Sequence, residues 1–166
     1  MDPRPASASR SVLAQWMGIA DTNPTGNVHG GTILKLADEV AGIAAVRHSR
    51  RRVVTAGVDR VTFVEPIAVG ELVTLSASVN AAWRTSMEVG VRVTAERPGH
   101  GEPRHTNTAY ITMVALDEAG RPTPVPPLLA ESPDEKRRER EAQTRRRNRL
   151  AEREEIKRHE AAGQRG

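Results

Sequence analysis

Apolar and polar positions alternate through the middle of the chain, which predicts a series of β-strands. The alternation is clearest at residues 87–96, where Met, Val, Val, Val and Ala alternate with Glu, Gly, Arg, Thr and Glu. Further strands are expected at residues 11–20, 53–64, 71–79 and 106–116, the last with apolar residues on both faces. The connections are short, which favours antiparallel pairing, so we expect one antiparallel sheet of about five strands.

Residues 31–47 follow a different pattern and predict a long helix. Its apolar residues, among them Ile33, Leu36 and Val40, cover most of the circumference, which indicates burial on nearly all sides. One long helix packed on an antiparallel sheet is an α+β arrangement. Because one helix cannot cover both faces of a five-stranded sheet, we expect the other face or an edge to meet a second copy of the chain.

The two ends of the chain are expected to lie outside a domain formed by residues 10–127. Residues 1–9 are mostly Pro, Ser and Ala and predict a flexible leader. Residues 128–166 are interpreted as a linker and a charged helix, which Ser132 caps and Pro133 opens. Because few residues of this helix are apolar, we predict a solvated, salt-bridged helix or a strut between subunits.

Composition and charge exclude several classes of protein. Without cysteine there is no disulfide, no thiolate zinc site and no cysteine nucleophile, and four aromatic residues offer little for stacking on bases. The net charge is +4, but residues 131–166 hold 12 basic and 9 acidic side chains. Such balance argues against strong binding to nucleic acid, which stays the weaker alternative for the tail. No apolar run reaches about 20 residues, so we expect no membrane-spanning segment and a cytoplasmic protein.

One segment combines residues that suit chemistry on a carbonyl group. Asn23 opens a type I turn, and Gly30 and Gly31 leave backbone N–H groups unshielded at the positive end of the helix. Such N–H groups can bind a carbonyl oxygen and the oxyanion that it becomes. Asp38 lies about 40° round the helix from Leu34, beside an apolar stripe where a raised carboxyl pKa is expected. Each residue also has an ordinary structural interpretation: close packing for the glycines and a turn for Asn23.

Two other chemistries find no support in the sequence. His29, Gly30 and Gly31 resemble the oxyanion loop of serine lipases, but no Gly-x-Ser-x-Gly motif occurs. The five histidines are scattered and none forms a pair with the usual spacing of metal ligands. We therefore predict no metal and no cofactor.

The same residues resemble the acyl-CoA thioesterases of the hotdog fold, of the type that includes the brain and cytosolic long-chain acyl-CoA hydrolases. The matching stretches span roughly residues 10–127, and they are Asp21–Glu39, Val54–Ile67, Arg84–Val89 and Val114–Asp117. The resemblance implies a single hotdog domain, with a long central helix wrapped by an antiparallel sheet. It also implies dimers whose sheets join, often three dimers in a hexamer.

The resemblance implies an active-site pair, Asn23 and Asp38, contributed by different subunits. Hydrolysis of fatty acyl-CoA to fatty acid and CoA would then use Asp38 as general base or as nucleophile. Asn23 would orient water or substrate, and the N–H of Gly31, with that of Gly30, would polarise the carbonyl. The phosphates of CoA are expected to meet basic and polar residues, the candidates being Arg50, Arg51, Arg52, Arg84, Thr85 and Ser86.

Two alternatives accompany this interpretation. A hotdog hydratase is disfavoured, because the His that such enzymes carry five residues after the Asp is Ile43 here. The other alternative is a non-catalytic protein that binds or senses acyl-CoA, with the charged tail as an oligomerisation or interaction element.

Overall fold

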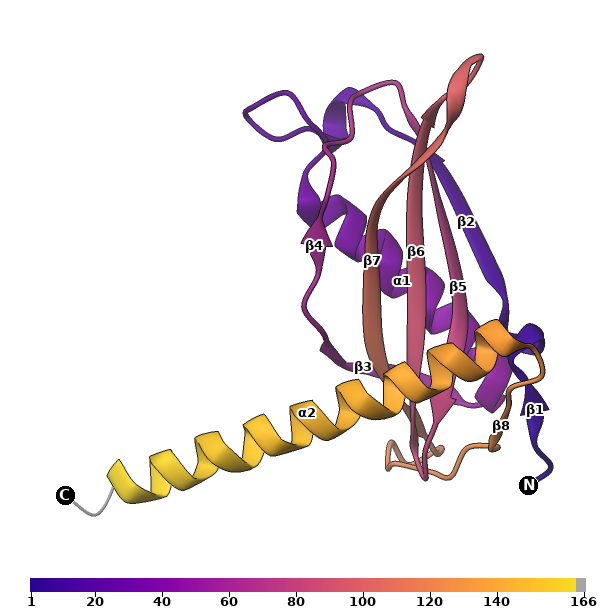
Figure 1. Ribbon diagram of the computed structural model, residues 1–166, viewed down its shortest axis with the longest axis vertical. Coiled ribbons are helices and arrows are strands. Elements are labelled where there is room, and N and C mark those ends of the chain that lie inside the picture. The colour runs from indigo at the N-terminus through magenta and orange to yellow at the C-terminus, as the bar shows by residue number, and fades with distance from the viewer. Residues whose placement is uncertain (164–166) are drawn as a thin grey trace.

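One antiparallel sheet organises the protein, whose computed structural model describes residues 1–163. The strands follow the order β2-β5-β6-β7-β3, and β4 pairs with the middle of β7, at Asn107 and Thr108 (Figure 1). Each of the five predicted strands is present. Their bounds are β2 Ser11–Trp16, β3 Arg52–Val58, β4 Thr62–Phe63, β5 Leu72–Ala82, β6 Ser86–Arg97 and β7 His100–Leu116. The predicted strand at 53–64 is divided into β3 and β4, and β7 begins earlier than expected.

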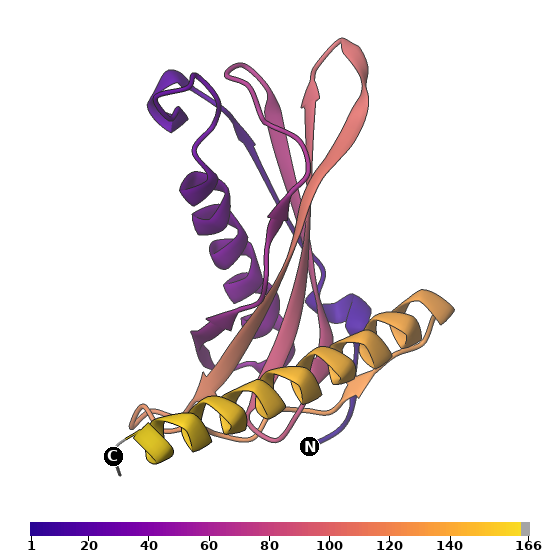
Figure 2. The same cartoon turned by 60° about the vertical axis from the view of Figure 1, so that its left-hand side comes forward.

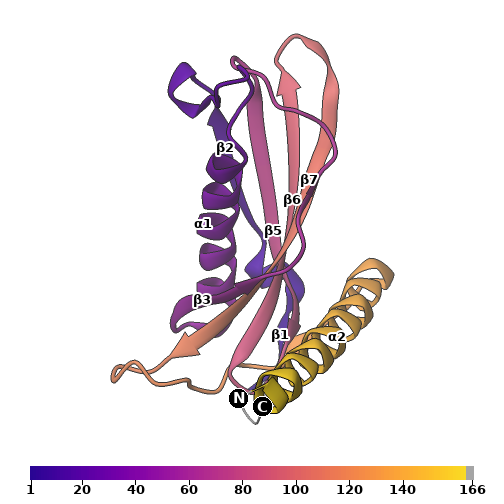
Figure 3. The same ribbon diagram turned by 90° about the vertical axis from the view of Figure 1, so that its left-hand side faces the viewer.

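The long helix α1, Gly30–Ser49, packs obliquely across one face of this sheet (Figures 1 and 3). Ile33, Val40 and Ala44 are buried against core residues of β5, β6 and β7. The fold is therefore the α+β hotdog arrangement that the sequence predicts. Burial on nearly all sides of the helix is wrong for the single chain, since Leu34, Ile43 and Val46 are 36%, 45% and 43% exposed.

Residues 1–9, expected to be a flexible leader, pack against the domain. The short strand β1, Arg4–Pro5, pairs in parallel with β8, Leu128–Leu129, and a 3₁₀ turn follows at Ala6–Ser9. Ser9 is fully buried: its hydroxyl donates to the Ala6 carbonyl at 2.7 Å and accepts from the Val79 N–H at 2.9 Å. The small side chains that suggested mobility are those that fit closely against β5.

The helix α2, Pro133–Gly163, crosses the outer face of the sheet, the face opposite α1 (Figures 1 and 2). Ser132 and Glu135 form the predicted cap, with Ser132 Oγ accepting from the Glu135 N–H at 3.2 Å and Glu135 Oε2 accepting from the Ser132 N–H at 3.1 Å. Its first half is not simply solvated, because Ala142 is fully buried and Arg145 pairs with Glu88 of β6. Part of the outer face therefore meets this helix. None of the helices in the described part of the chain is long and apolar enough to span a membrane.

Candidate functional site

The loop before α1 holds Asn23 in a defined turn. The Gly26 N–H donates to the Asn23 carbonyl at 3.0 Å, which is the turn that the sequence predicts. Asn23 Oδ1 accepts from the Thr25 N–H at 3.0 Å, from Thr25 Oγ1 at 2.6 Å and from the Asn27 N–H at 3.3 Å. These bonds occupy the oxygen of the side chain. Within the described residues Nδ2 donates to no protein atom, so it is the part of Asn23 that can bind a ligand.

His29 changes the expected role of the glycine pair. Its Nδ1 accepts from the Gly31 N–H at 2.9 Å and thereby caps the helix. A Cβ at Gly31 would lie 3.1 Å from the same nitrogen, and a Cβ at Gly30 would lie 3.3 Å from the Phe63 ring. Close packing therefore explains both glycines, and the Gly31 N–H, expected to bind a carbonyl oxygen, is already occupied by His29.

Asp38 lies on the exposed side of α1 and has a partner that the sequence analysis missed. Thr55 Oγ1 of β3 donates to Asp38 Oδ1 at 2.5 Å and also lies 3.5 Å from Met113 Sδ. This hydroxyl fixes one oxygen of the carboxylate and leaves Oδ2 free to take a proton or attack a carbonyl. Thr55 lies within one of the stretches that resemble the thioesterases, but a threonine in a Val-rich and Thr-rich strand gives no further signal.

An open apolar surface surrounds Asp38. On α1, Leu34, Ile43 and Val46 are partly exposed, and Val58 of β3, which pairs with the core residue Ile111 and so lies on the α1 side of the sheet, is 50% exposed. The strand β3 ends the sheet on this side and pairs with β7 alone among the named strands. The carboxylate therefore sits between an unpaired strand edge and an apolar helix face, which suits the apolar part of a substrate and a second copy of the chain.

The structure separates the two halves of the predicted active site within one chain. Eight residues of α1 separate Gly30 from Asp38, which is about 12 Å along the helix axis. Asn23 belongs to the turn that precedes the helix. Such spacing is too long for one water or one carbonyl to contact both groups. Within one chain Asp38 and the start of α1 therefore do not form a joint site.

The candidate CoA contacts gather at the opposite end of α1. Arg50, in the left-handed conformation with φ 56°, ends the helix, and Arg50, Arg51 and Arg52 are all exposed. The β5–β6 turn that carries Arg84 and Thr85 lies at the same end, because Arg52 pairs with Leu116 and Ser86 with Val114 on β7. Ser86 Oγ accepts from Arg146 Nη1 of α2 at 3.4 Å, so this hydroxyl faces α2 rather than Asp38.

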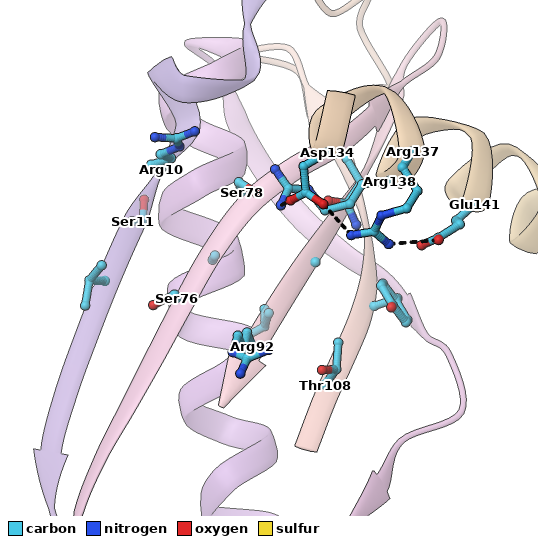
Figure 4. Close-up of a pocket in the computed structure, with 16 residues that line it drawn as sticks. Arg10, Ser11, Ser76, Ser78, Arg92, Thr108, Asp134, Arg137, Arg138 and Glu141 are labelled. Atoms are coloured by element: carbon cyan, nitrogen blue, oxygen red, sulfur yellow. Dashed lines mark hydrogen bonds and ion pairs between the residues drawn. The ribbon is translucent and has the colours of Figure 1, made fainter. Parts of the chain in front are cut away.

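A separate cavity of about 550 Å³ lies on the outer face of the sheet, under the first turns of α2 (Figure 4). It contains none of the predicted site residues. Hydroxyl groups of the sheet and charged groups of α2 line it, among them Ser76, Ser78, Thr108, Arg92 and Arg138. Arg138 and Arg137 are both paired with Asp134. The sheet therefore separates this polar cavity from Asp38.

Comparison with known proteins identifies the family. Residues 25–102 match the model of the thioesterase superfamily. The cytosolic acyl coenzyme A thioester hydrolase of Rattus norvegicus is 39% identical over 139 residues, which is 82% of this chain but 36% of that protein. The chain thus spans about a third of the length of that relative.

Solved structures match over almost the whole chain. A hexameric acyl-CoA thioesterase in its apo form is 37% identical, with a TM-score of 0.88 over 92% of this chain and 97% of that one. The acyl-CoA hydrolase of Staphylococcus aureus, solved with butyryl coenzyme A and coenzyme A, is 34% identical, with a TM-score of 0.87 over 93% and 94%. Fold, motifs and identity agree, and the chain belongs to the thioesterase superfamily of hotdog proteins.

Proposed function

We propose that this protein is an acyl-CoA thioesterase, which hydrolyses fatty acyl-CoA to a fatty acid and CoA. The observation that carries the proposal is the Asp38 carboxylate, held by Thr55 on an open apolar surface of α1. A thioester needs a group that activates water or attacks the carbonyl, next to a surface that accepts an alkyl chain. The family relationship and the names of the relatives support the same activity.

Asp38 can act in two ways, and both give the same products, a fatty acid and CoA. As a general base it takes a proton from water while the water oxygen attacks the thioester carbon, and the C–S bond breaks with its electron pair on the CoA sulfur. As a nucleophile its free oxygen attacks the carbonyl, CoA thiolate leaves, and water then hydrolyses the mixed anhydride. Thr55 keeps the carboxylate in position in both routes.

Asn23 and the start of α1 complete the proposed site from a second copy. Asn23 Nδ2 orients water or substrate, because its oxygen is held in the turn. The Gly30 N–H polarises the carbonyl, and the Gly31 N–H joins it when His29 turns away. We further propose that Arg50–Arg52 and Arg84–Ser86 contact the phosphates of CoA.

Variants of the Staphylococcus aureus hydrolase support this choice of residues. Solved variants of that protein replace an asparagine, an aspartate and a threonine by alanine. Its asparagine and aspartate are fifteen positions apart and its threonine follows seventeen positions later. Asn23, Asp38 and Thr55 have the same spacings here.

We propose a homo-oligomer in the cytoplasm, with a dimer as the unit that forms each site. The open β3 edge and the exposed apolar residues of α1 support a joined sheet. The hexameric assembly of one solved thioesterase favours three such dimers. Sedimentation velocity of the purified protein tests this, and a monomer at micromolar concentration would contradict it.

Release of CoA from acetyl-, octanoyl- and palmitoyl-CoA, followed with a thiol reagent, tests the activity. We expect turnover of at least one ester and loss of most kcat in Asp38→Asn, with unchanged melting temperature. No release from any of the three would overturn the proposal. A specific observation, the capped Gly31 N–H, favours the alternative of acyl-CoA binding without turnover. Tight binding of palmitoyl-CoA without release of CoA would support this alternative.

A further inference from the structure

Asn107 of β7 is fully buried on the face of the sheet that α1 covers. Its Cα partners are Val93 of β6 and Phe63 of β4. Directly opposed residues of antiparallel strands point to the same face. Val93 belongs to the core, and Phe63 lies against the start of α1. The Asn107 side chain therefore points to the α1 side of the sheet, next to Phe63, whose ring lies against Gly30 at the start of α1.

One half of this amide has no partner. Thr106 Oγ1 lies 3.3 Å from Asn107 Oδ1 and 3.3 Å from the Val93 carbonyl oxygen, so its single hydrogen is shared between these two acceptors. Asn107 Nδ2 is buried, yet no described residue accepts a hydrogen bond from it. A buried amide donor without an acceptor is destabilising, and native proteins rarely keep one without a reason. Asn107 thus presents a buried amide donor that has no acceptor among the described residues.

The surroundings indicate what kind of molecule brings that acceptor. Phe63 is 45% exposed and Val64 is 65% exposed, so the way in from the open side is apolar. Phe63 is also the cross-strand partner of Asn107, and its ring lies against Gly30, where the thioester carbonyl is proposed to lie. An acyl chain that is mainly apolar suits the exposed Phe63 and Val64. An oxygen on that chain, away from the thioester, would supply the acceptor for Asn107.

We propose that Asn107 Nδ2 donates a hydrogen bond to a hydroxyl or oxo oxygen on the acyl chain, so that oxygenated acyl-CoA esters are preferred substrates. The proposal rests on the proposed thioesterase activity and names its substrate class. The chain passes Gly30, displaces the Phe63 ring and places its oxygen against the amide. An unsubstituted alkyl chain in the same place leaves Nδ2 without an acceptor. A buried polar group that is left unpaired is what makes a site reject a substrate without the matching group.

The test compares octanoyl-CoA with octanoyl-CoA esters that carry a single hydroxyl group at successive odd carbons. For the wild type we expect kcat/KM to be about tenfold higher for one hydroxylated ester than for octanoyl-CoA, the size of one good neutral hydrogen bond. Asn107→Leu, which removes the donor at similar size, is expected to lower the ratio of kcat/KM between that ester and octanoyl-CoA to about one.

Asn80→Leu is the matched control. Asn80 is also a buried asparagine with an unpartnered side-chain atom, but it lines the cavity on the outer face of the sheet. This variant is expected to keep the wild-type ratio. Equal kcat/KM for all esters in the wild type, or a ratio that survives in Asn107→Leu, would overturn the proposal.

A protein that hydrolyses none of these esters would refute the thioesterase activity instead. In that case the role of Asn107 is tested by the rise in the melting temperature of the protein when each ester binds. A larger rise for one hydroxylated ester, lost in Asn107→Leu and kept in Asn80→Leu, supports the contact. Equal rises for all esters would overturn it.

Discussion

At the residue scale, the sequence identifies chemistry-bearing side chains better than their partners. Asp38 is predictable because a carboxylate is unusual on a helix whose neighbours are apolar, and Asn23 because its turn has a definite pattern. The hydrogen bonds from Thr55 to Asp38 and from Gly31 to His29 are not predictable. The first depends on where β3 lies relative to α1, which no local pattern encodes. The second is local, but histidine is not among the residues that usually cap a helix.

Thr55 provides a prediction at this scale. Thr55→Val keeps the shape of the side chain and removes the hydroxyl that holds Asp38 Oδ1. Because a misplaced general base loses much of its effect, we expect kcat to fall about 10- to 100-fold with little change in KM. Steady-state kinetics with palmitoyl-CoA measures it. Thr55→Ser is the control and should keep most activity, and an equal loss in both variants would argue against the hydrogen bond.

His29 provides a second prediction. His29→Ala removes the acceptor of the Gly31 N–H and with it the cap of α1. Loss of a helix cap costs about 1 kcal/mol, so the free energy of unfolding in urea should fall by roughly that amount. His159→Ala, near the far end of α2 and exposed, should leave it unchanged. An undiminished stability in His29→Ala would show that this cap contributes nothing.

At the element scale, the period of the apolar pattern predicts whether a segment is a strand or a helix. The highly charged sequence of α2 does not reveal which part of the domain it packs against. Strand alternation and the long apolar helix identify the sheet and α1 correctly, since burial on one side leaves a regular signal. The tail has no such signal. It packs through ions: Arg145 pairs with Glu88, Arg149 pairs with Asp59, and Arg145 lies 3.6 Å from the centre of the Tyr110 ring. In the sequence Glu88 looks like any outward polar residue of a strand.

The Glu88–Arg145 pair gives a prediction for this element. Glu88 is fully buried, and Arg145 Nη2 lies 2.7 Å from its Oε1. Arg145→Ala removes the nearest cation and leaves the buried carboxylate with Asn80 Nδ2 at 3.3 Å and Arg149 Nη1 at 3.9 Å. We expect it to lower the free energy of unfolding by about 3 kcal/mol in urea titrations.

Two further variants isolate the ion pair. Adding Glu88→Gln to Arg145→Ala should recover part of the loss, because the buried charge is gone. Arg147→Ala, at an exposed position of the same helix, should change stability by less than about 0.5 kcal/mol. A double variant as unstable as Arg145→Ala alone would contradict the account.

At the scale of the whole molecule, buried titratable groups couple stability to pH. His48 is fully buried at the end of α1, and its Nε2 lies 2.9 Å from the Pro126 carbonyl oxygen. Burial lowers the pKa of His48 below its ordinary value of 6.5, against the effect of that hydrogen bond, and the charge of Arg4 lowers it further. The unfolded chain therefore binds a proton at this residue at a higher pH than the folded protein does.

The expected result is that stability falls as pH drops below about 6.5, because protons favour the unfolded chain in that range. Urea unfolding at a series of pH values between about 5 and 7.5 measures the slope. His48→Gln keeps a hydrogen-bond donor and does not titrate, so its slope should be smaller. A slope unchanged by this substitution would assign the pH dependence to other groups. The buried carboxylate Glu71, whose pKa is lowered mainly by its hydrogen bond from Arg104, acts in a more acidic range.

The single chain has apolar surface and a strand edge that a second copy can cover. From the sequence we expect a second copy of the chain to cover the part of the sheet that α1 leaves open. The helix α2 covers some of this surface, on the outer face. The exposed residues of α1 and the unpaired β3 edge remain, with Asp38 among them. These features support the proposal that each active site lies between two copies of the chain.

Complementation between two inactive variants tests this most directly. Asn23→Ala and Asp38→Asn are each expected to lose most kcat on palmitoyl-CoA. When the two are denatured together and refolded, half of the dimers should contain one subunit of each kind, and each of these should hold one intact site. The account predicts recovery of about a quarter of wild-type activity. Mixtures that stay as inactive as the separate variants would contradict a site shared between subunits.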